Sequence, residues 1–90
     1  MNTPRIENMD GRTGRKVCNQ FKIFAEDGVY FQSYSTIIAF KPYGEGKIRL
    51  SREAWDYSRT TGKYRNQFLR ETKAETEKKI KAGIYELVDF

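Results

Sequence analysis

The sequence of 90 residues contains no histidine and a single cysteine, Cys18. Without histidine, a serine or cysteine nucleophile lacks the base that most often activates it. One cysteine excludes an internal disulfide, and the lack of histidine also excludes the usual Cys/His metal sites. We therefore expect no enzyme activity, no catalytic residue, no cofactor and no metal.

Long apolar runs are missing as well. None approaches the ~20 residues that span a bilayer, and the start of the chain lacks the apolar core of a signal peptide. We expect a protein of the cytoplasm with no membrane partner. The length fits one domain.

Two short stretches resemble part of a phosphate-binding loop. That loop needs a glycine separated by four residues from a Gly-Lys pair, and a serine or threonine after the lysine. Around Gly62-Lys63, Tyr57 occupies the upstream position and Tyr64 the downstream one. Gly46-Lys47 fits a turn better, so neither stretch predicts a phosphate loop.

What the sequence has in abundance is positive charge and aromatic rings. Its formal net charge is +5, with six Tyr, six Phe and one Trp. Between Lys47 and Lys81 there are eleven basic and five acidic residues, whereas between Val17 and Gly46 there are two basic and three acidic. This asymmetry favours a polyanion or an acidic protein surface as partner, and a solvated surface of mixed charge is the plainer alternative.

The first 16 residues contain two Gly, one Pro and four basic residues. This composition predicts a flexible N-terminal arm over 1–16 and one globular domain over 17–90. Alternation or short apolar runs predict strands over 17–25, 29–34, 37–40 and 47–50, joined by turns at 27–28 and 42–46. Such short turns predict an antiparallel meander.

The period then changes to that of helices. Ser51 is a good N-cap for a short helix containing Trp55, and Thr60-Thr61-Gly62 interrupts that helix. Thr72 and Glu75 have the spacing of a capping box for a last helix, which Gly83 ends. Residues 84–90 predict a fifth strand. The expected fold is α+β, an antiparallel sheet of about five strands with two to three short helices before the last one (β-β-β-β-α-α-α-β).

The best candidate for a binding surface is the segment 57–67, which mixes cations, aromatics and amides. Arginine can hold phosphate or carboxylate with two hydrogen bonds, and tyrosine can fill a pocket or stack on a base. We expect partner-binding residues here, namely Tyr57, Arg59, Lys63, Tyr64 and Arg65. The structural alternative is that the tyrosines face the sheet. Asp56 is interpreted as a partner of a nearby arginine such as Arg52 or Arg59.

Residues 30–40 and 55–69, the latter with the signature Trp-Asp-Tyr-Ser-Arg-Thr-Thr-Gly-Lys-Tyr-Arg-Asn, resemble a family of small uncharacterised proteins encoded by bacteriophages and prophages. The segment 72–90 is also similar, so the resemblance covers about 19–90. It implies a phage accessory protein that binds a host protein or ribonucleoprotein machine stoichiometrically. Counter-defence, an anti-CRISPR-like role and host takeover are the settings that it implies.

Two other hypotheses about the function stay open. In the first, the protein is a nucleic-acid-binding module that stacks bases on Tyr30 and Tyr34 beside cationic helices, and its affinity falls as salt rises. In the second, it is a sponge for a nucleotide signal, which would need oligomerisation to enclose a pocket.

Overall fold

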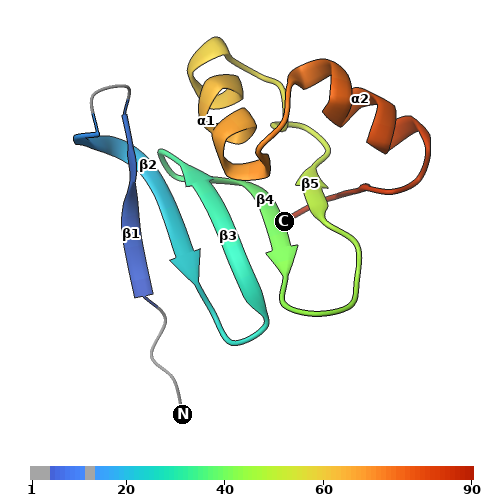
Figure 1. The fold of residues 1–90 in the computed structure, drawn as a ribbon, viewed down its shortest axis with the longest axis horizontal. Coiled ribbons are helices and arrows are strands. Elements are labelled where there is room, and N and C mark those ends of the chain that lie inside the picture. The colour runs from blue at the N-terminus through green and yellow to red at the C-terminus, as the bar shows by residue number, and fades with distance from the viewer. Residues whose placement is uncertain (1–4, 12–13) are drawn as a thin grey trace.

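The computed structural model describes residues 5–11 and 14–90, which form one six-stranded sheet and two helices (Figure 1). The sheet order follows the chain, from β1 to β6. The strands are β1 (Arg5–Asp10), β2 (Lys16–Phe24), β3 (Gly28–Ser33), β4 (Thr36–Pro42), β5 (Arg49–Ser51) and β6 (Glu86–Val88). The helices α1 (Arg59–Leu69) and α2 (Lys73–Lys81) lie between β5 and β6 in the chain. The α+β class is confirmed.

The sheet is mixed, because its last strand runs parallel to its neighbour. Strands β1 to β5 form an antiparallel meander, which was expected for β2 to β5, whereas β6 pairs in parallel with β5 from Arg49↔Glu86 to Ser51↔Val88. The prediction of an antiparallel sheet is therefore wrong for β6. Parallel neighbours need a long crossover connection, and the segment that carries α1 and α2 provides it.

The structure places an additional strand inside the predicted arm. Residues 5–10 form β1, which pairs with β2 from Arg5↔Phe24 to Asp10↔Lys16, so the sheet begins well before residue 17. Met9 is 1% exposed and belongs to the core. The pattern was hidden because Ile6 and Met9 are three residues apart and so point to opposite faces of the strand. Residues 1–4 and 12–13 of the predicted arm lie outside the described residues.

The first predicted helix is also wrong, because residues 52–56 form turns. Ser51 does cap a single turn, since its hydroxyl accepts the N–H of Ala54. Two backbone groups of this segment then find partners elsewhere, as the N–H of Arg52 donates to Val88 O and the carbonyl of Trp55 accepts from Arg65. In a continuing helix the Trp55 carbonyl would accept an N–H of the next turn, so its hydrogen bond from Arg65 takes the place of helix continuation.

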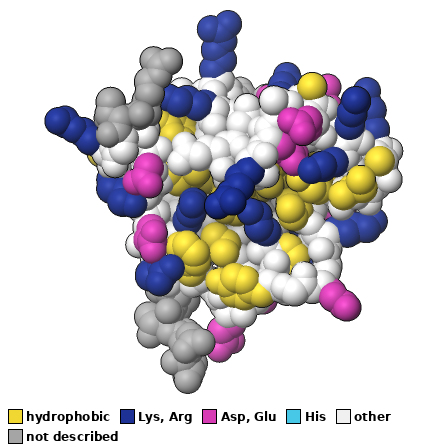
Figure 2. Space-filling view, viewed as in Figure 1, with side chains coloured by type: hydrophobic (Ala, Val, Ile, Leu, Met, Phe, Trp, Pro, Cys, Tyr) yellow, Lys and Arg dark blue, Asp and Glu magenta, His cyan; other side chains and the backbone are white. Residues whose placement is uncertain are grey.

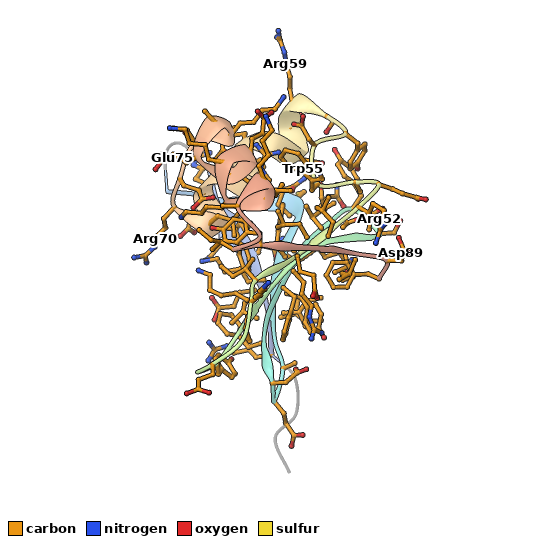
Figure 3. All side chains as sticks on the ribbon, turned by 90° about the vertical axis from the view of Figure 1, so that its right-hand side faces the viewer. Arg52, Trp55, Arg59, Arg70, Glu75 and Asp89 are labelled. Atoms are coloured by element: carbon orange, nitrogen blue, oxygen red, sulfur yellow. The ribbon has the colours of Figure 1, made fainter. Side chains whose placement is uncertain are left out.

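Both helices gather at one end of the sheet and on one of its faces (Figures 1 and 3). The core lies between the helices and the sheet. In it the rings of Phe31 on β3 and Phe68 on α1 stack with centroids 5.7 Å apart. Tyr30 and Phe40 pair across β3 and β4 and face the opposite side, with ring centroids 4.5 Å apart. The helices therefore leave one face, and part of the other, uncovered.

A buried carboxylate ties α2 to the rest of the fold. Glu71 lies between the helices with its side chain only 4% exposed. It accepts hydrogen bonds from the hydroxyls of Thr76 (2.6 Å) and Tyr85 (2.8 Å) and from Lys79 Nζ (2.7 Å). Thr72 and Glu75 form the predicted capping box, and Gly83 after the helix takes the left-handed φ of 77°.

Candidate partner-binding groove

Helix α1 begins at Arg59, with Ser58 as its N-cap. The Ser58 hydroxyl accepts the N–H of Thr61, and its carbonyl accepts the N–H of Gly62. The helix therefore passes through Gly62, where the sequence predicted a break. Because residues four apart share a face of a helix, this start brings Arg59 and Lys63 to the same face.

That face borders an open groove of about 490 Å³, which we call the α1 groove. The preceding turn and the start of α2 complete its lining. Its principal side chains are Asp56, Tyr57, Arg59, Lys63, Asn66 and Lys73. Two segments of the chain thus meet at one surface, residues 56–66 and the start of α2.

Three of the five predicted site residues are accessible in this groove. Tyr57 is 52% exposed, and Arg59 and Lys63 are exposed as well. Arg59, at the start of α1, projects from the body of the molecule (Figure 3). Within the described part of the chain, neither Arg59 nor Lys63 forms a salt bridge.

The other two predicted residues, Tyr64 and Arg65, are buried. Tyr64 is 6% exposed and packs in the core, as the structural alternative stated. Arg65 is 1% exposed, although arginine is seldom found inside proteins. Both were wrong as contact residues, because the helical face they occupy turns toward the sheet and the preceding turn.

Arg65 holds the wall of the groove together. Its Nη1 donates to Trp55 O at 2.7 Å and to Asp56 Oδ1 at 3.2 Å, and its Nη2 donates to Asn66 Oδ1 at 2.9 Å. The guanidinium also lies 5.2 Å from the centre of the Trp55 ring. Arg65 therefore positions the turn that carries Tyr57, while its own Nε has no hydrogen-bond partner among the residues that the structure describes.

Asp56 is shared between the helices. Its Oδ1 meets Arg65, and its Oδ2 lies 2.7 Å from Lys73 Nζ at the start of α2. The hydrogen bond from Lys73, helped by that from Arg65, lowers the pKa of Asp56 despite partial burial, and the same contact raises the pKa of Lys73. Asp56 does pair with an arginine as interpreted, but with Arg65, and not with Arg52 or Arg59. Sequence reasoning missed Lys73, since only the fold brings α2 to this place.

The groove carries a positive potential beyond its side chains. The first N–H groups of a helix have no partner within it, and the helix dipole places partial positive charge there. The first turn of α1 contains no acidic residue to offset that charge. Arg59 and Lys63 add two cations to it, so the arrangement suits a carboxylate or a phosphate.

The tyrosines proposed for base stacking do not join this groove. Tyr30 lies on the sheet face away from the helices, where it packs against Phe40 and Phe90. Tyr34 is 55% exposed in the turn between β3 and β4, at a φ of 56°. Neither ring belongs to the lining of the α1 groove, and Tyr30 is on the face away from the cationic helices.

The described residues contain neither a membrane-spanning helix nor a cluster of metal-binding side chains. Neither α1 nor α2 is long and apolar enough to cross a bilayer. In residues 5–11 and 14–90, no three His, Cys, Asp or Glu side chains gather as a metal ion would require.

Comparison with known proteins identifies a family. Residues 5–83 match the model of the family of unknown function DUF8033. The curated proteins and the solved structures contained no match. The matched segment runs from β1 through both helices, and the chain therefore belongs to the DUF8033 family.

Proposed function

We propose that this protein acts by stoichiometric binding to a host protein machine in the bacterial cytoplasm, as a phage accessory protein of counter-defence, anti-CRISPR-like or host-takeover type. The observation that carries the binding role is the α1 groove, where exposed Tyr57 lies beside Arg59 and Lys63. The phage setting rests on the sequence resemblance alone.

The residue types of the groove favour a protein partner. Tyrosine and arginine are enriched among the few side chains that dominate protein interfaces. The wall that carries Tyr57 is fixed by the Arg65 contacts, so little ordering is needed on binding. The positive groove would then meet an acidic patch of the partner, and this match speeds association and favours the correct partner.

A nucleic acid is the second candidate, favoured by the unpaired cations at the helix start. The small number of available cations counts against it, because Lys73 in the groove lining is held by Asp56 at 2.7 Å, which leaves Arg59 and Lys63 for phosphates. With two cations engaged, the logarithm of affinity for duplex DNA would fall by about 0.9 per phosphate neutralised for each tenfold rise in salt. This shallow dependence differs from that of proteins making many phosphate contacts.

The test is capture from bacterial host lysate with the tagged full chain, with and without nuclease, using three proteins in parallel. One is the unaltered chain and one is the double variant Arg59→Ala/Lys63→Ala. The third, Lys78→Ala/Lys81→Ala, removes the same charge from exposed positions on α2.

We expect one host protein at equal stoichiometry on the unaltered chain and the α2 control, with affinity weakened at least about 30-fold by the groove variant. If the captured material disappears with nuclease, the partner is a nucleic acid and the proposal of a host protein is wrong. Equal binding by all three proteins would remove the α1 groove from the interface.

A further inference from the structure

A second cationic site lies at the other end of α1, where the helix ends above the uncovered part of the sheet. This hollow of about 280 Å³ is lined by Lys22, Phe24, Val29, Lys41, Phe68 and Arg70, among others. We call it the basic hollow. Figure 2 shows basic side chains gathered beside hydrophobic ones in the middle of one molecular face, and Figure 3 shows Arg70 projecting on the side of the helices.

The strand register explains why these side chains converge. Phe24, Val29 and Lys41 are paired across β2, β3 and β4, so they form one row on one face. Lys22 is two residues before Phe24 and therefore points to the same face. Lys41 Nζ donates to Phe68 O at 3.2 Å, which holds this ammonium beside the end of α1.

Three cations meet here without a matching carboxylate. Over the described ranges, no salt bridge includes Lys22, Lys41 or Arg70. Burial, followed by the charges of Arg70 and Lys22, lowers the pKa of Lys41 against a smaller opposing effect of Glu71. Like charges held this close repel one another, and an anion between them would relieve that repulsion.

The nearby acidic side chains are already engaged. Glu7 lies opposite Lys22 in the register but bonds to Arg5 Nε at 2.9 Å. Glu71 follows Arg70 in the chain, and its carboxylate is held by Lys79, Thr76 and Tyr85. The positive charge of the basic hollow is thus available to a ligand.

The backbone of Arg70 is an independent indication. Arg70 caps the end of α1 in the left-handed conformation, with φ 58° and ψ 46°. This position usually holds glycine, because a Cβ is unfavourable there, and α2 in the same chain is followed by Gly83 in that conformation. An arginine kept at such a position suggests that its side chain is used.

The rest of the lining suits a flat group. Phe24 and Val29 are partly exposed, and the guanidinium of Arg5, which is not itself part of the lining, lies 4.2 Å from the centre of the Phe24 ring. Aromatic rings and guanidinium planes are surfaces on which nucleobases stack. The volume lies near the lower end of the roughly 300–1,000 Å³ of small-molecule sites, so the ligand would be small.

We infer that the basic hollow binds a nucleoside monophosphate, with Lys22, Lys41 and Arg70 around the phosphate and the Arg5–Phe24 pair against the base. The group is either a free nucleotide or one unit of a single strand. The basic hollow and the α1 groove lie at opposite ends of α1, so this inference does not depend on the proposed function.

The test is a titration of the isotope-labelled full chain with AMP, followed through backbone amide NMR signals. We expect shifts at residues 22–24, 29, 41 and 68–70, and none at 57–63. Ribose 5-phosphate, which lacks the base, should bind more weakly. A short single-stranded oligothymidylate is the third probe, and binding more than about tenfold tighter than AMP would identify a strand as the source.

Three variants test the residues. Lys22→Gln and Arg70→Gly should each weaken AMP binding about tenfold or more, because each removes a charge-assisted contact. Lys78→Gln removes the same charge from α2 and should change binding less than about twofold. Arg70→Gly suits the left-handed backbone, so its melting temperature should match or exceed that of the unaltered chain, which separates lost binding from lost folding.

Absence of shifts with all three probes at low salt would overturn the site. Equal weakening by Lys78→Gln would overturn it as well, since diffuse charge attraction would then explain the binding. Equal affinity for AMP and ribose 5-phosphate would keep the phosphate site and remove the base contact.

Discussion

At the scale of single residues, the buried Glu71 carboxylate connects the segment after α1 to α2 and to Tyr85, the residue before β6. Replacing it in Glu71→Gln keeps the shape but removes the charge that Lys79, Thr76 and Tyr85 bind. We expect a loss of about 2–3 kcal/mol in the free energy of unfolding, measured with urea. The control Glu77→Gln, whose contact with Lys73 is 3.9 Å and half exposed, should lose less than about 0.5 kcal/mol.

The same carboxylate predicts a loss of stability in acid. Burial alone would raise the pKa of Glu71, but the hydrogen bonds from Lys79, Thr76 and Tyr85 outweigh burial and lower it below the ordinary 4.5. A lowered pKa in the fold means that the stabilisation is present above pH 4.5 and is lost as the pH falls through the lower folded value. Urea unfolding between pH 7 and pH 3 should show this loss in the unaltered chain, with a flatter profile in Glu71→Gln. Parallel profiles would contradict the shift.

Tyr85 predicts a loss of stability at high pH. Burial, together with its hydrogen bond to Glu71, raises the pKa of Tyr85 from 10.0 to about 12. The neutral phenol therefore stabilises the fold fully below pH 10, and this contribution disappears as the pH rises toward 12. Ultraviolet absorbance of the phenolate should show one tyrosine with a midpoint near 12, and Tyr85→Phe should remove that component. If Tyr85→Phe leaves the high-pH part of the curve unchanged, Tyr85 is not the shifted group.

At the scale of elements, Ser58 fixes where α1 begins. Ser58→Ala removes the hydroxyl that accepts the Thr61 N–H and should lower the free energy of unfolding by about 1 kcal/mol. Ser35→Ala, in an exposed turn, serves as the control and should be nearly neutral. A neutral Ser58→Ala would mean that the Ser58 hydroxyl does not fix the start of the helix.

The elements that sequence patterns identified are those whose signal is local. Alternation located β2 and β3, and Thr72 with Glu75 located the start of α2. Sequence patterns failed where contacts between residues distant in the chain determine the structure. The segment 52–56 gives the N–H of Arg52 to Val88, and Arg65 became a buried residue because Asp56 and the Trp55 carbonyl meet its guanidinium. No spacing in the sequence contains that information. Of the five predicted site residues, only Tyr57, Arg59 and Lys63 are therefore accessible in the α1 groove.

At the scale of the whole molecule, β1 decides where the folded domain begins. Met9→Ala should lower the free energy of unfolding by about 2–4 kcal/mol, because the side chain is fully buried in the core. A chain shortened to begin at Val17 lacks all of β1 and should lose at least as much. Thermal unfolding followed by circular dichroism measures both. If the shortened chain is as stable as the full one, the folded domain begins at residue 17, as the sequence predicted.

The parallel pairing of β5 with β6 also has a consequence for how the chain acquires its structure during synthesis. Strands β1 to β5 pair with sequence neighbours and can assemble as they leave the ribosome, because local contacts need little loop closure. Strand β6 can join only after both helices have been made, since Arg49 pairs with Glu86 near the end of the chain. Until then Leu50, 0% exposed in the finished fold, stands at an open sheet edge. The nascent protein thus passes through a stage in which chaperones or aggregation can act on that edge.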